Sequence, residues 1–123
     1  MKIIDAHIHL HNDPYFDRIA LAAGHENTLE HLKKTFERYN IAHAIVMGNN
    51  VLGSDELSYP DYVSYCVGLD SIWCHAADKS YLQIEKHLQR PNCVGIKLYP
   101  GYISCYVSDP IYQPIYELAK QYK

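Results

Sequence analysis

The sequence has no long hydrophobic run and no cluster of basic residues. No stretch approaches the roughly 18 consecutive apolar residues that cross a bilayer. Met1 and Lys2 lead directly into Ile-Ile-Asp, so the apolar core of a signal peptide is missing from this start. The formal net charge of -3 disfavours nucleic acid and anionic membranes as partners. We therefore expect a cytoplasmic protein that binds neither nucleic acid nor membrane.

Cysteine pairs at metal-binding or redox spacing are also missing, since none of the four cysteines belongs to a Cys-x-x-Cys motif. Three of the four lie in or beside apolar, strand-like segments. We interpret them as reduced thiols that pack as small hydrophobic residues. The four positions are Cys66, Cys74, Cys93 and Cys105.

The chain has 123 residues and a hydrophobic content of 48%, which is enough for one domain with a buried core. Strand patterns alternate with helix patterns, and this alternation predicts parallel strands joined by right-handed crossovers. We thus expect residues 1–123 to form a single α/β domain. Strands are predicted over 3–10, 41–47, 62–69 and 93–99, and helices over 27–40, 76–90 and from 109 onward.

Local signals fix several of these boundaries. Asn27 is predicted to cap the first helix, with Glu30 reaching back to it. Asp109 followed by Pro110 is a start signal for the last helix. The nearly continuous apolar run over 41–47 predicts a strand that is buried on both faces. Residues 11–26 are polar and are interpreted as a long loop.

The segment with the clearest chemistry is Asp5-Ala6-His7-Ile8-His9. Residues i and i+2 of a strand point to the same face, so the two imidazoles project side by side. This arrangement suits two ligands of one metal ion, such as zinc. Asp5 and His11 are also an even number of residues from His7, so the strand is expected to present one polar face at its C-terminal end. In a chain with 8 histidines the spacing can arise by chance, but its place at the end of an apolar strand favours a metal site.

This start resembles strand one of the amidohydrolase superfamily, and most closely the branch called amidohydrolase-related, or family 2. Three later stretches agree in order and spacing. The Gly-Ile-Lys-Leu-Tyr-Pro-Gly stretch favours this branch over the TatD-like nucleases and PHP phosphoesterases, which share the His-x-His start. The three stretches are 59–70, 94–101 and 109–119.

The resemblance implies a TIM-type (β/α)8 barrel with a divalent metal, zinc foremost, at its C-terminal mouth. It assigns His7 and His9 as metal ligands. The family takes further ligands and a base from strands five, six and eight, which this sequence does not reach. A full barrel takes about 250 residues, so we expect four parallel βα units that form its N-terminal half. The implied function is a metal-dependent hydrolase in which metal-activated water attacks a carbonyl-type small-molecule substrate, incomplete in this chain.

Three other residues are weaker catalytic candidates: Asp5, Lys97 and Asp70. Lys97 lies near the mouth end of the fourth strand, where other branches carry a carbamylated lysine. It is better explained as a charged strand end paired with a carboxylate. Tyr99 shares its parity and is a candidate substrate contact, and Asp70 closes the third strand. We interpret three histidines as solvated loop residues (His11, His25 and His75) and assign no role to His31, His43 and His87.

Other functions fit the same residues. The chain can be a non-catalytic, truncated or self-associating half-barrel module. It can also be a decarboxylase of the same family or a TatD-like nuclease. In a half-barrel the first and fourth strands are open edges, which together with an apolar inner face predict a homodimer.

Overall fold

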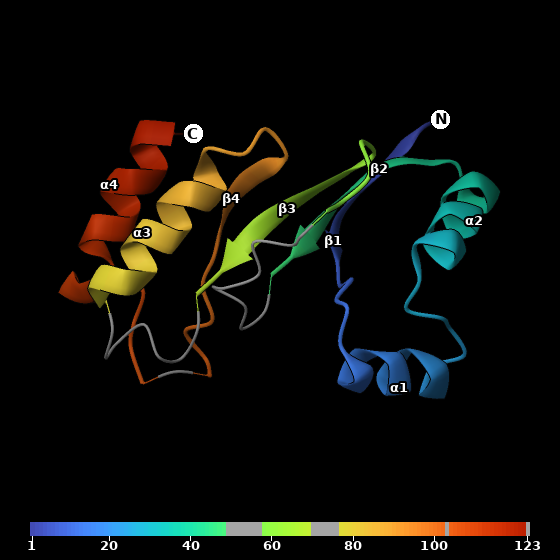
Figure 1. Ribbon diagram of the computed structural model, residues 1–123, viewed down its shortest axis with the longest axis horizontal. Coiled ribbons are helices and arrows are strands. Elements are labelled where there is room, and N and C mark those ends of the chain that lie inside the picture. The colour runs from blue at the N-terminus through green and yellow to red at the C-terminus, as the bar shows by residue number, and fades with distance from the viewer. Residues whose placement is uncertain (49–57, 70–76, 103, 123) are drawn as a thin grey trace.

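The computed structural model describes residues 1–48, 58–69, 77–102 and 104–122. Its four strands form one parallel sheet in the order β1-β2-β3-β4, which confirms the predicted α/β fold (Figure 1). No helix in these ranges is long and apolar enough to cross a membrane. The elements are β1 (Ile3–Ile8), α1 (Pro14–Ala22), α2 (Leu29–Tyr39), β2 (Ile41–Met47), β3 (Val63–Gly68), α3 (Ala77–Leu88), β4 (Cys93–Lys97), the short 3-10 helix η2 (Pro110–Tyr112) and α4 (Gln113–Tyr122).

The two faces of the sheet differ in burial. Ala44 and Val46 of β2 are fully buried, whereas their neighbours His43, Ile45 and Met47 are only half-buried. The prediction that this strand is buried on both faces was therefore wrong. Neighbouring parallel strands joined by right-handed crossovers carry their helices on the same face. The half-buried alternates of β2 thus point to the opposite face.

The core lies between the buried face of the sheet and helices α3 and α4. Branched aliphatic and tyrosine side chains from both layers form one contiguous cluster. Tyr112 of η2 is buried in it, although the sequence pattern did not mark this residue. The main members of the cluster are Val46, Val63, Tyr65, Val67, Ile84, Leu88, Tyr112, Ile115 and Leu118.

Helix α1 occupies a region where a loop was expected. Its N-cap is Asp13, whose Oδ1 accepts a hydrogen bond from the backbone N–H of Tyr15 at 2.7 Å. Pro14 takes the first helical position, where its missing N–H costs nothing. None of its side chains is fully buried. Phe16, Ile19 and Ala20 have helical i, i+3, i+4 spacing, but the polar residues around them suggested a loop.

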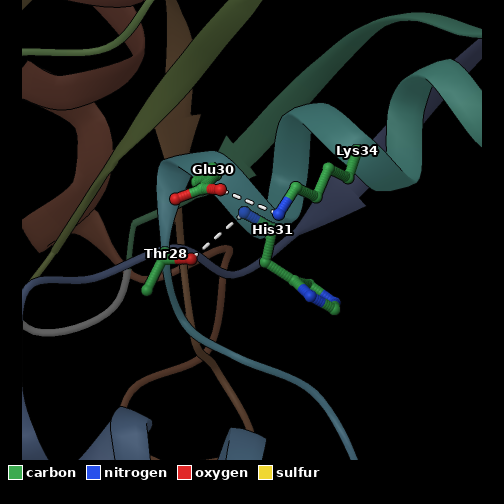
Figure 2. Close-up of polar contacts among 4 residues, drawn as sticks. All are labelled: Thr28, Glu30, His31 and Lys34. Carbon is green, nitrogen blue, oxygen red and sulfur yellow. Dashed lines mark hydrogen bonds and ion pairs between the residues drawn. The ribbon is translucent and has the colours of Figure 1, made fainter.

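The start of α2 lies one residue later than predicted. Figure 2 shows that Thr28 is the cap, because its Oγ1 accepts a hydrogen bond from the N–H of His31 at 3.1 Å. Glu30 does not reach back to the cap. It forms an exposed ion pair with Lys34 at 2.7 Å, one turn along the helix. The helix ends as predicted at Asn40, whose φ of 58° is left-handed.

The end of β2 depends on a close approach between strands. A Cβ at Gly48 would lie 2.6 Å from the backbone oxygen of Cys66 and 2.6 Å from the backbone nitrogen of Gly68. Because backbone atoms cannot move aside as a flexible side chain can, we expect Gly48→Ala to lower the free energy of unfolding by about 1–3 kcal/mol. Urea denaturation followed by circular dichroism measures this change.

Gly101→Ala is the matched control, because a Cβ at Gly101 meets nothing within 4 Å. Its effect should stay within about 0.5 kcal/mol. Equal stability of the two variants would contradict the packing that brings the ends of β2 and β3 together.

Candidate functional site

His7 and His9 come together at the carboxyl end of β1. Their Nε2 atoms are 3.3 Å apart, and their rings meet edge to face with centroids 5.1 Å apart. Asp5, the third polar residue of this stretch, turns toward the backbone, where its Oδ1 accepts a hydrogen bond from the N–H of His7 at 3.1 Å. Ile8 points the other way and packs against the core cluster. The predicted same-face arrangement of the two histidines is confirmed.

The separation of the two Nε2 atoms fits a shared metal ion. With zinc–nitrogen bonds of 2.0–2.1 Å and a tetrahedral angle, two imidazole nitrogens lie about 3.3–3.4 Å apart. A hydrogen bond between two neutral imidazoles gives a similar separation. Within the described ranges, no group of three or more His, Cys, Asp or Glu side chains is arranged to hold a metal ion. Two imidazoles fall short of the three or four protein ligands that zinc sites use.

His11 is not the solvated loop residue that the sequence predicted. Its ring is half-buried and packs against Phe16, with centroids 4.6 Å apart. Its Nε2 is buried and has no hydrogen-bond partner among the residues described. The rings of His9 and His11 are 6.1 Å apart, so three imidazoles follow one another past the end of β1.

Burial favours the neutral form of two of these imidazoles, because it lowers the pKa of each. Burial, followed by the positive charge of Lys97 and the neighbouring His7, lowers the pKa of His9. Burial, followed by the neighbouring His9, lowers the pKa of His11. The neutral imidazole is the form that binds metal ions. The lowered pKa leaves more of His9 in this neutral form, whereas the positive charge of Lys97 opposes a cation at the same place.

Lys97 lies at the end of β4, as the sequence predicted, and acts on His9 from there. Its Nζ is 3.9 Å from the centre of the Tyr99 ring, a cation–π contact. The predicted shared orientation of these two residues is thus observed. Asp70 and His75, the other candidates from this end of the chain, lie outside the described residues.

A cavity of about 340 Å³ lies beside the histidine pair, between α1, α2 and the end of β1. The ring of His9 forms part of its wall. The sequence did not predict it, because it depends on α1, which was interpreted as loop. Its apolar lining comes from Leu10, Phe16, Ile19, Ala20 and Leu32.

Two histidines without a predicted role make polar contacts in the sheet and the core. His43 Nε2 is 2.9 Å from Ser64 Oγ, across β2 and β3. His87 Nδ1 is 2.8 Å from the buried Tyr65 hydroxyl, between α3 and β3. Both pairs join residues more than twenty positions apart, so they depend on strand register and helix docking. No local sequence signal reveals them.

Comparison with protein-family models, with curated proteins and with solved structures found no match for this chain. The evidence about this site therefore comes from the residues and distances given above. The most informative observation is the 3.3 Å separation between the Nε2 atoms of His7 and His9.

Tyr59 and Tyr65 link the stability of the fold to alkaline pH. Burial raises the pKa of both hydroxyls to about 12, and the Tyr59 hydroxyl donates to the backbone oxygen of Leu10 at 3.3 Å. Between pH 10 and 12 the unfolded chain loses protons that the folded chain keeps. The free energy of unfolding should therefore fall as pH rises through this window.

Urea denaturation from pH 9 to 11.5 measures this fall, and Tyr59→Phe should make it shallower. Tyr102→Phe is the control, since Tyr102 is 85% exposed. An unchanged slope in Tyr59→Phe would show that this hydroxyl ionises normally.

Proposed function

We propose that this chain is a metal-dependent hydrolase of the amidohydrolase-related type, with a divalent ion, zinc foremost, bound by His7 and His9. The observation that carries the proposal is the 3.3 Å separation of their Nε2 atoms, which matches two ligands of a tetrahedral ion. The lowered pKa of His9, caused first by burial, supports it. The resemblance of the first strand to the amidohydrolase motif supplies the reaction class.

The residues around the pair have separate roles in this proposal. When bound, the ion lowers the pKa of water and polarises a carbonyl oxygen. His7 and His9 hold it. Asp5 fixes the backbone at His7 through its 3.1 Å hydrogen bond and so acts as a positioning residue. The Lys97 ammonium, held over the Tyr99 ring, would stabilise negative charge that develops on the carbonyl oxygen as water attacks.

We propose further that a second copy of the chain completes the site. The outer strands of the sheet carry exposed apolar side chains: Ile4 of β1 is 65% exposed and Val94 of β4 is 40% exposed. The influence of Lys97 on His9 supports a curved sheet, since β1 and β4 of a flat sheet lie about 14 Å apart. Two curved four-stranded sheets related by a two-fold axis close an eight-stranded barrel. Its mouth then holds four imidazoles.

A non-catalytic, self-associating module is the second candidate. The observation in its favour is that the described ranges hold no group of three or more metal-binding side chains. In that case His7 and His9 share a hydrogen bond, and the exposed apolar edge of β1 serves association alone. Metal content separates the two functions.

Zinc titration of the metal-free protein by isothermal calorimetry tests the metal site. We expect about one zinc per chain or per dimer, and a loss of affinity of at least tenfold in His7→Ala and in His9→Ala, because each removes one ligand. His25→Ala is the control, since this exposed histidine lies outside the pair. Unchanged zinc affinity in both pair variants would remove the basis for a hydrolase.

Light scattering after size exclusion tests the second copy. The expected mass is twice the 14.2 kDa of one chain. Ile4→Lys and Val94→Lys should each give monomers, because charge on an edge strand blocks pairing. Leu82→Lys changes an equally exposed residue of α3 and should leave the dimer intact. A monodisperse monomer of the unmodified chain at high concentration would exclude this arrangement.

A further inference from the structure

The cavity beside the histidine pair has the features of a ligand site. Its volume of about 340 Å³ lies within the range of small-molecule pockets. Helices α1 and α2 form its sides, and His9 from the end of β1 connects it to the proposed metal site. A molecule bound here lies next to His9.

The connection between α1 and α2 is held in place around this cavity. The Asn27 side-chain amide donates to the backbone oxygen of His11 at 2.5 Å and to Asp17 Oδ1 at 2.8 Å. These two bonds tie the end of the connection to the segment after β1 and to α1. The walls of the cavity therefore come from three segments that are joined to one another.

The lining combines apolar and polar side chains. Phe16, Ile19 and Leu32 supply apolar surface, and Ile19 is 47% exposed although it lines a cavity. His25 and His31 also belong to the lining, and their rings meet edge to face with centroids 5.8 Å apart. Figure 2 shows the His31 ring pointing away from the neighbouring ion pair of α2.

The charges in the lining select against anions. Glu26 contributes a carboxylate, and the lining includes no lysine or arginine. An anionic group bound here would lie beside the Glu26 carboxylate, while Lys34 and Lys97 act on Glu26 and His9 from outside the lining. A neutral group that accepts or donates hydrogen bonds instead finds imidazole partners in His25 and His31.

We propose that this cavity binds the apolar part of the substrate, so that the substrate is a neutral amide or ester of a compact apolar group. A cavity of about 150 Å³ holds one benzene molecule, so this one of about 340 Å³ accepts up to roughly thirteen non-hydrogen atoms. The binding of the apolar group rests on the cavity alone, whereas its being part of a hydrolysed substrate rests on the proposed function.

The first test uses metal-free protein and 3-phenylpropionamide as a neutral probe, with binding followed by ligand-observed NMR and calorimetry. We expect saturable binding with a Kd of about 1 mM or tighter. Ile19→Trp fills the cavity and should weaken binding at least tenfold. Leu21→Trp places the same bulk on the same helix at a residue outside the lining, and should bind as the unmodified chain does.

Thr35→Trp fills the cavity from α2 and repeats the test if Ile19→Trp does not fold, which circular dichroism shows. The anionic probe 3-phenylpropionate should bind at least tenfold more weakly than the amide. Absent binding, or equal binding by both cavity variants and the control, would overturn the site. Equal affinity for amide and carboxylate would overturn the neutral class.

A second test with zinc-loaded protein separates the cavity from the metal. Phenylpropanohydroxamic acid should bind at least tenfold more tightly than acetohydroxamic acid, and Ile19→Trp should abolish that difference while Leu21→Trp keeps it. If the neutral amide binds but no zinc site is found, the cavity stands and the hydrolase proposal fails. If both hydroxamates bind zinc equally, the metal stands and the cavity is not part of the substrate site.

Discussion

The alternation of buried and half-buried side chains in the sheet is the constraint on which this structure depends. One face of β2 and β3 packs against α3 and α4, and each large aliphatic side chain buried there contributes about 1.5–3 kcal/mol. Because side chains alternate, burying Val46 and Val63 turns His43 and Ser64 to the other face. The same rule turns His7 and His9 away from the core, since Ile8 between them packs into it. The core therefore determines where the polar residues lie.

The segment after β1 adds the second part of the site. It folds into α1 because Asp13 and Pro14 start a helix, and Asn27 then ties its far end to Asp17. This segment packs on the end of β1 through Phe16, which contacts both His9 and His11. A segment whose composition suggests a polar loop thus forms an apolar wall beside the imidazoles. His9 belongs both to the histidine pair at the end of β1 and to the lining of the cavity, so the position of one is tied to that of the other.

The sequence predicted those features that depend on period and local capping. The i, i+2 spacing of His7 and His9 was sufficient to place them on one face, and the four strands and their parallel order followed from the alternation with helices. The prediction failed for α1, where a helix-start signal was set aside because the residues after it are polar. Asp13 followed by Pro14 is the same start signal as Asp109 followed by Pro110, but the polar residues after it suggested a loop. The first residue of α2 could not be predicted either, because Asn27 and Thr28 are both residue types that cap helices well.

Contacts between distant segments lay beyond any local signal. The burial of His11 depends on Phe16 folding back from α1 onto the end of β1, and the burial of His87 depends on its bond to Tyr65. The lowered pKa of His9 likewise comes first from burial and then from Lys97, which lies on the far strand of the sheet. A sequence specifies these only through the completed fold, because each requires the register of strands that are not adjacent along the chain.

The proposed metal site and the uncovered face of the sheet have one physical origin. In a parallel sheet whose successive strands lie side by side, every right-handed crossover leaves the same face without a helix. His7 and His9 lie on that face, so in the proposed dimer the further ligands come from the strands that cover it. Under this proposal, occupancy by metal and closure of the sheet are expected to be thermodynamically linked. A metal bound by two imidazoles of one chain is weak, and the same metal bound between two such sheets stabilises the contact that creates its own site.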